Sequence, residues 1–77
     1  MNIYSIKLIT QGGKKTISVE DTKTVSGILE ENGVMYGGLQ VNVNGQPLQA
    51  SELNLPLNRF AVRDGSFISA LGKQDNA

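Results

Sequence analysis

The chain has 77 residues, a length that forms one small domain. It contains no cysteine and no histidine, which excludes disulfides, thiolate zinc sites, a thiol nucleophile and the usual acid–base side chain near neutral pH. Seven basic residues balance seven acidic ones, so the strong positive field typical of proteins that bind nucleic acids is absent. We therefore expect a protein that is not an enzyme, with no catalytic residue, no cofactor and no metal, and we expect no nucleic-acid partner.

The chain also lacks the signals of membrane insertion and export. No apolar run approaches the roughly 20 residues that cross a bilayer, and the first residues lack the basic stretch and apolar core of a signal peptide. We expect a small soluble cytoplasmic protein with no membrane partner. Residues 1–72 are predicted to form a single domain, and the polar residues 73–77 a flexible C-terminal tail.

The first predicted elements form a β-hairpin. Residues 3–9 are rich in β-branched residues, and Tyr4, Ile6 and Leu8 alternate with polar neighbours, as in a half-buried strand. A glycine-containing turn follows at residues 11–14. Residues 16–20 resume the strand pattern.

A short helix is predicted next. Thr24 is a suitable N-cap, because its hydroxyl can accept from the free N–H groups of the first turn. Gly33 is a suitable stop, and Gly27 weakens the helix or allows it to approach the sheet closely. The apolar stripe recurs at helical spacing: Val25, Ile28 and Leu29.

Two further strands are predicted after an irregular connection. Residues 39–43 alternate between apolar and polar, and Asn44-Gly45 is a strong hairpin signal. Residues 46–49 return as a short strand. Pro47 cannot donate a backbone hydrogen bond, so this strand belongs at a sheet edge.

A covering segment and a last strand complete the chain. Ser51 is predicted to cap a single helical turn that Pro56 ends, with the leucines of residues 53–57 under the edge of the sheet. Residues 63–66 form a turn with Gly65 at positive φ. Residues 67–71 form the last strand.

The order of these elements predicts an α+β fold. Two strands, one helix and then more strands form a mixed sheet of four to five strands with the helix packed across one face. The first and last strands lie parallel at its centre, because a helix-bearing connection separates the two halves. This is the β-grasp (ubiquitin-like) arrangement.

Three short segments resemble those of the thiamine and molybdopterin sulfur-carrier proteins (the ThiS/MoaD family). The helix start Thr24-Val25-x-x-Ile28-Leu29 is similar to theirs. Val41-Asn42-Val43-Asn44-Gly45 resembles their third strand and turn. Val62-x-Asp64-Gly65-Ser66-x-Ile68 resembles their approach to the last strand. The likeness covers nearly the whole chain and implies the same fold.

The resemblance also implies a chemistry that depends on a C-terminal Gly-Gly, whose carboxylate is adenylated and converted to a thiocarboxylate. This sequence ends in Asn76-Ala77, and Gly72 stands alone. The leading hypothesis is therefore a non-catalytic ubiquitin-like protein-interaction module, a sulfur-carrier relative without the carrier tail, acting on an unknown protein partner. The alternative is a sulfur-carrier protein with a processed or atypical C-terminus.

Candidate protein contacts lie on the sheet and in the connection after the helix. If Tyr4, Ile6 and Leu8 point to the helix, the other face presents a mostly polar surface on which Ile3 and Ile9 are apolar islands. Met35 and Tyr36 either point outward as a contact spot, or one of them closes the core. The candidate residues are Lys7, Ile9, Met35, Tyr36, Gln40 and Asn42.

Other groupings have simpler explanations. Asp64, with Arg59 and Arg63, could form an anion site, but a turn aspartate that binds its own backbone explains it more simply. Lys14-Lys15 is typical of a solvated hairpin tip. Residues 16–20 are predicted to lie at a sheet edge and could pair with their copy, so the chain is expected to be a monomer or an edge-strand homodimer.

Overall fold

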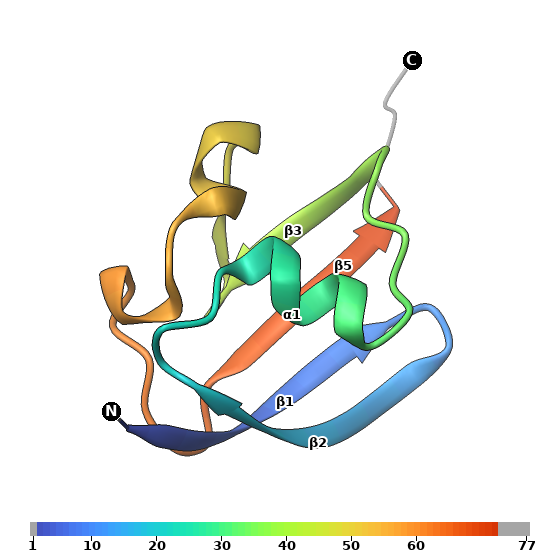
Figure 1. The fold of residues 1–77 in the computed structure, drawn as a ribbon. Helices are drawn as coiled ribbons and strands as arrows, with labels where there is room; N and C mark the ends of the chain where they lie inside the picture. Colours follow the sequence, from blue (N-terminus) through green and yellow to red (C-terminus); the bar gives the residue numbers. More distant parts are fainter. Residues whose placement is uncertain (1, 73–77) are drawn as a thin grey trace.

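The computed structural model describes residues 2–72, which form one five-stranded sheet with a helix across one face (Figure 1). The order across the sheet is β2-β1-β5-β3-β4. The central pair β1 and β5 is parallel, and the other pairs are antiparallel. The elements are β1 (Ile3–Thr10), β2 (Gly13–Glu20), α1 (Val25–Glu31), β3 (Leu39–Val43), β4 (Gln46–Pro47), the 3-10 turns η1 (Ala50–Asn54) and η2 (Leu57–Arg59), and β5 (Phe67–Gly72).

The architecture predicted from the sequence is confirmed: a mixed sheet with a single helix, and parallel first and last strands at its centre. The strand predicted over residues 16–20 is longer, because the β2 ladder begins immediately after a two-residue turn. Residues 73–77, predicted to form a flexible tail, lie outside the described residues.

The core lies between the sheet and α1. Alternate residues of β1, β3 and β5 point toward the helix and are almost fully buried, as the alternation of apolar and polar residues predicts. Each fully buried aliphatic side chain contributes about 1.5–3 kcal/mol through removal of its surface from water. The core residues are Ile6, Leu8, Val19, Val25, Ile28, Leu29, Val41, Val43, Leu57, Ile68 and Ala70.

Both ends of α1 are capped as the sequence predicts. Thr24 Oγ1 accepts a hydrogen bond from the Gly27 N–H at 3.0 Å. At the other end Gly33 has φ of 74° and donates to the Glu30 carbonyl, while Val34 donates to the Leu29 carbonyl. These two bonds form a Schellman motif, which satisfies carbonyl groups left free by the end of the helix.

Gly27 does not bring the helix close to the sheet. A Cβ atom at this position would lie 3.0 Å from Thr24 Oγ1, the same oxygen that caps the helix. The glycine therefore leaves space for the cap. Of the two alternatives for this glycine, a close helix–sheet approach is excluded, because Gly27 faces the N-terminal turn.

The segment after β3 departs from the prediction in two places. The strand predicted over residues 46–49 is shorter, with β4 confined to Gln46–Pro47 at the sheet edge where the proline was expected, although the Leu48 N–H still donates to the Val41 carbonyl at 2.9 Å. Ser51 does not cap the next turn. The Glu52 carboxylate accepts from the Gln49 N–H at 2.8 Å, so η1 begins after Gln49. The deep leucine of the covering segment is Leu57, which is fully buried.

Candidate functional site

The face of the sheet opposite α1 forms the candidate site, and we call it the open face. In Figure 1 it is the far side of the sheet, behind the helix. Cross-strand partners in register point to the same face, so the strand pairings define its rows. One row crosses all five strands: Lys14, Ile9, Ser69, Asn42 and Pro47. A second row contains Thr16, Lys7 and Phe67, and a third contains Leu71 and Gln40.

Four apolar side chains of β1 and β5 lie on this face. Ile9 on β1 and Phe67 on β5 are half-buried, while Leu71 near the end of β5 is 40% exposed and Ile3 at the start of β1 is 64% exposed. The Phe67 ring lies against the β3–β4 turn, where a Cβ on Gly45 would be 3.9 Å from the ring edge. The open face is therefore partly apolar without being a second core. Such mixed composition is typical of non-obligate protein interfaces.

Polar groups at the centre of the open face are withdrawn from water. Ser69 is only 7% exposed, although no helix among the described residues covers it. Its cross-strand neighbour is Asn42, whose side-chain Oδ1 is buried without a hydrogen-bond partner among the described residues. An unpaired buried acceptor costs about 1–3 kcal/mol. A donor from a binding partner would remove that cost.

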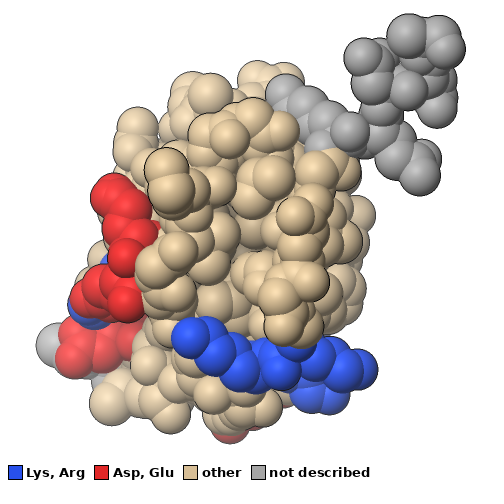
Figure 2. All heavy atoms as spheres, turned by 90° about the vertical axis from the view of Figure 1, so that its right-hand side faces the viewer, with Lys and Arg blue, Asp and Glu red and all other residues tan. Residues whose placement is uncertain are grey.

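Charge is distributed unevenly over the surface. Lys7 and Lys14 lie on the β1–β2 side of the open face, and residues 32–51 carry no charge at all. Figure 2 faces the hairpin end of the molecule. It shows acidic side chains on the helix side, a band of lysines low on this end, and a broad uncharged surface above them. The open face thus combines a neutral, partly apolar centre with a charged β1–β2 side, where Lys7 and Lys14 lie toward the hairpin and Glu20 lies at the far end of β2.

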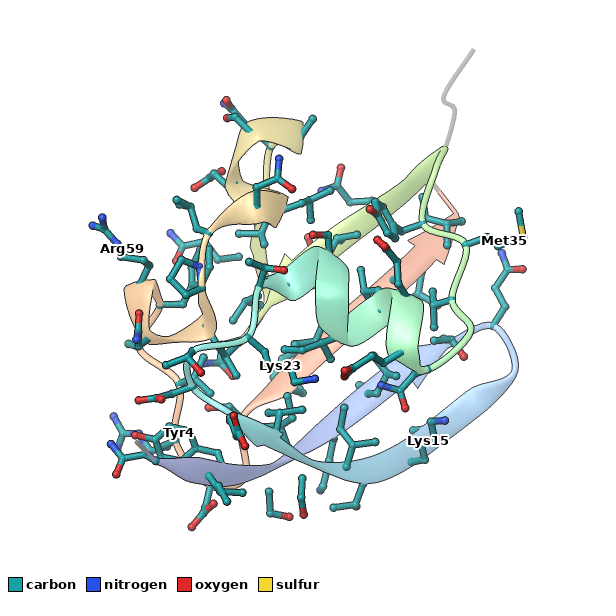
Figure 3. The ribbon with its side chains drawn as sticks, in the orientation of Figure 1. Tyr4, Lys15, Lys23, Met35 and Arg59 are labelled. Atoms are coloured by element: carbon teal, nitrogen blue, oxygen red, sulfur yellow. The ribbon has the colours of Figure 1, made fainter. Side chains whose placement is uncertain are left out.

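The structure separates the six candidate residues into two groups. Lys7, Ile9, Gln40 and Asn42 share the open face, as expected. The other two lie in the connection between α1 and β3. The Met35 side chain is 90% exposed and points away from the body of the protein (Figure 3). Tyr36 packs against the core. Of the two alternatives for this pair, Tyr36 therefore takes the core position, and Met35 stands alone.

The two turn signatures of the sequence meet in space. Asn44 has φ of 52° and opens the β3–β4 turn. Its Nδ2 donates to Ser66 Oγ and to the Ala61 carbonyl, both at 3.2 Å, and its Oδ1 accepts from the Phe67 N–H at 3.0 Å. These bonds tie β3 to the approach to β5. The side chains that carry the sequence resemblance at this point are structural.

Asp64 is structural as well, by a different contact from the one expected. Its Oδ1 accepts from the Ser5 N–H at 2.8 Å, and the Gly65 N–H donates to the Ser5 carbonyl at 2.9 Å. The carboxylate therefore joins the last turn to β1, where we had expected it to bind its own turn. Within residues 2–72 no hydrogen bond or ion pair joins it to Arg59 or Arg63.

The described residues also form a cavity, but neither a group of metal ligands nor a membrane-spanning helix. A cavity of about 230 Å³ lies between the hairpin tip and the end of α1, lined by residues including Leu8, Lys15 and Val34. Within residues 2–72 no three His, Cys, Asp or Glu side chains are grouped as metal ligands. Nor does that part of the chain include a helix of the length and apolarity needed to traverse a bilayer.

Comparison with solved structures identifies the architecture. The ubiquitin-like domain of an Arabidopsis thaliana protein superposes with a TM-score of 0.72 at 20% identity, covering 100% of this chain and 84% of that one. A ubiquitin-like protein from Trypanosoma brucei gives 0.71 at 16% identity, covering 94% and 96%. The ubiquitin of Caldiarchaeum subterraneum gives 0.68 at 16% identity, covering 99% and 100%. The chain has the ubiquitin-like β-grasp fold.

The ubiquitin-like assignment rests on structure. No protein-family model and no curated protein matches the sequence. The TM-scores of 0.72, 0.71 and 0.68 establish the shared fold. At identities of 16–20% a shared fold does not carry a shared function, so the functional argument depends on the residues of the open face. The sulfur-carrier resemblance stays a prediction from the sequence.

Phe67, Leu71 and Pro47 lie on the open face of this ubiquitin-like domain but were not predicted to do so. The sequence placed Phe67 and Leu71 in the last strand without indicating which side of the sheet they occupy, and it placed Pro47 only at the sheet edge. A signal was present, because Phe67, Ser69 and Leu71 alternate with the buried Ile68 and Ala70. Their position beside Ile9 and Asn42 depends on the register of β5, which the sequence does not display.

Proposed function

We propose that this ubiquitin-like protein is a non-catalytic interaction module that binds another protein through its open face. The observation that carries the proposal is the buried, unpaired Oδ1 of Asn42 at the centre of an uncovered and partly apolar sheet face. Ile9 and Leu71 supply apolar area on the β5 and β1 side of Asn42, and Lys7 and Lys14 supply positive charge beyond. A partner with an apolar centre, a hydrogen-bond donor and acidic residues at one side fits this face.

The charged side and the centre of the open face have different roles in the proposal. Rim charges mainly increase the rate of association and select against wrong partners. The affinity is expected to come from the apolar residues and from satisfaction of the Asn42 acceptor, because fully desolvated groups near the centre of an interface dominate its energy. Binding should therefore weaken only moderately in salt.

The test compares substitutions on and off the open face. We expect Ile9→Lys and Leu71→Lys each to abolish capture of specific proteins from lysate of the native cells. The control Met35→Lys makes the same kind of change at a more exposed apolar residue in the α1–β3 connection, and it should leave capture intact. Amide chemical shifts of the wild type, titrated with a captured protein, should change on β1, β3 and β5.

Two results would contradict the proposal. One is a set of captured proteins that is the same for the wild type and both open-face variants. The other is a shift map confined to the α1–β3 connection or to the helix surface. Circular dichroism of each variant checks that the fold is retained, so that lost binding is not mistaken for unfolding.

The proposal also places the chain among sulfur-carrier relatives that work without the carrier tail. The intact mass of the protein from its own cells tests this part separately. We expect a mass that includes the residues after Gly72 and no added sulfur. A mass ending at Gly72, or one that includes an added sulfur, would instead support the carrier alternative, whatever the open face binds.

A further inference from the structure

The outer edge of β2 is a long unpaired strand edge. β2 contains eight residues, all of them in register with β1, and it is the first strand in the sheet order. No other described strand lies along its outer side. Exposed edges of this length are templates for pairing with another strand, and most proteins shorten, bend or charge them.

The hydrogen-bond alternation shows which backbone groups are available. The Asp21 N–H donates to the Asn2 carbonyl at the end of the β1–β2 ladder. Every second residue of a strand directs its backbone toward the same neighbour, so residues 13, 15, 17 and 19 also face β1. The outward residues are therefore Lys14, Thr16, Ser18 and Glu20. Of their polar groups, only the Glu20 carbonyl is already used, accepting from the Lys23 N–H at 3.1 Å.

The side chains of these outward residues lie on the open face. Lys14 is in register with Ile9 and Thr16 with Lys7. Ile17 and Val19 point the other way, toward the core, and Ile17 is only half-buried there. Lys15 lies on the helix side as well, at the hairpin (Figure 3). The edge thus has one basic residue at its start and one acidic residue at its end, both on the same face.

We propose that β2 pairs with β2 of a second copy, antiparallel and centred on Ile17. In this register Lys14 of one copy lies directly opposite Glu20 of the other, and the two-fold axis repeats the pair. Thr16 and Ser18 lie opposite each other and exchange backbone hydrogen bonds. The Ile17 side chains of the two copies meet on the helix side in a close, non-hydrogen-bonded pair, which buries the apolar surface that β1 leaves exposed.

The charge pattern and Ile17 together favour this register. A shift by two residues in one direction places Lys14 opposite Ser18 and pairs no opposite charges. The shift in the other direction places Lys14 opposite Thr22 and pairs Lys15 only with Asp21, which lies beyond the end of β2, and it separates the two Ile17 side chains. Shifts by one residue would oppose an outward residue to an inward one. Edge lysines normally oppose association. Here Glu20 of the second copy neutralises the charge, so the strand is complementary to itself when antiparallel.

Such a dimer would join two sheets into one continuous sheet. The two-fold axis is then perpendicular to the sheet, so both open faces look to the same side and both helices to the other. A dimer of this kind would present two copies of the proposed binding face together. The dimer and the proposed function are nevertheless separate claims, because Glu20→Lys breaks the Lys14–Glu20 pairing without altering Ile9, Leu71 or the two lysines assigned to the binding face.

Charge reversal tests the register. Sedimentation equilibrium at low salt would compare the wild type with Lys14→Glu, Glu20→Lys and the double variant Lys14→Glu/Glu20→Lys. Each single variant turns both symmetry-related pairs into like-charge contacts and should weaken the dimer roughly tenfold. The double variant restores opposite charges and should return to within about threefold of the wild type. Lys15→Glu is the matched control, with the same change of net charge on the other face, and should stay within about threefold.

Three outcomes would overturn the proposal. A wild type that remains monomeric up to about 1 mM would show that the edge does not pair at a useful affinity. If neither single reversal changed the dimer affinity, the dimer would form through another surface. If the Lys15→Glu dimer were as weak as the Lys14→Glu dimer, or if the dimer of the double variant stayed weak, the loss of affinity would come from net charge or from the substitutions themselves, and not from the proposed register. Circular dichroism of all variants confirms folding.

Discussion

At the scale of single residues, Asn44 holds together the two turns that gave the sequence its family resemblance. It adopts a positive φ, which is uncommon for residues other than glycine, and its side chain makes three hydrogen bonds to the approach to β5. Asparagine suits both demands, because its short amide tolerates the left-handed region and offers donors and an acceptor. No other standard side chain combines them as well.

We expect Asn44→Ala to lower the free energy of unfolding by about 2 kcal/mol, since the three side-chain bonds are lost and alanine is strained at φ of 52°. Asn44→Gly loses the same bonds but not the backbone conformation, and should cost about 1 kcal/mol. Urea unfolding at fixed pH measures both. Two variants as stable as the wild type would show that these bonds contribute nothing.

At the scale of elements, α1 depends on its ends. Its seven residues are too few to form a stable helix alone. The Thr24 cap, the Schellman motif at Gly33 and packing of one apolar face against the sheet hold it in place. The cap and Gly27 are linked, because a side chain at residue 27 would press on the capping oxygen. The space needed by the cap therefore favours glycine at this position, although alanine has the higher helix propensity.

A double-mutant cycle tests this link. Thr24→Ala should cost about 1 kcal/mol through loss of the cap. Gly27→Ala should bring little gain in the wild type, because its Cβ would crowd Thr24 Oγ1. In the Thr24→Ala background the same change should stabilise by up to about 1 kcal/mol, the ordinary gain of alanine over glycine. Additive effects in chemical denaturation would refute the coupling. Thr22→Ala, in the exposed loop before the cap, is the control.

At the scale of the whole molecule, stability depends on a segment remote from the helix in sequence. Leu57 in η2 is fully buried, and its N–H donates to the Lys23 carbonyl at 2.8 Å. The covering segment thereby closes the core at the loop that leads into α1. In a domain of this size each core contact contributes a large share of the free energy of unfolding, because small domains bury a smaller fraction of their surface.

Leu57→Ala is expected to destabilise the protein by about 2–5 kcal/mol, since it removes a fully buried side chain and leaves a cavity. Leu55→Ala, two residues away and only half-buried, is the control and should cost less than half as much. Thermal unfolding followed by circular dichroism at equal protein concentration compares the two. Equal losses would mean that η2 does not close the core.

The sequence by itself determined the elements and their order, because each depends on local chemistry. Alternation marks β1 and β3, Thr24 and Gly33 bound the helix, and Asn44-Gly45 specifies the hairpin. The sequence also placed four of the six candidate residues on one face, since side chains alternate along a strand whatever its neighbours are.

Contacts between distant segments decided the rest. The register of β5 set Phe67 and Leu71 beside Ile9, and the bond from Ser5 to Asp64 joined residues 59 apart in sequence. The outward edge of β2 exists only because the sheet order leaves that strand outermost, and sheet order is a property of the packed chain that no local pattern encodes.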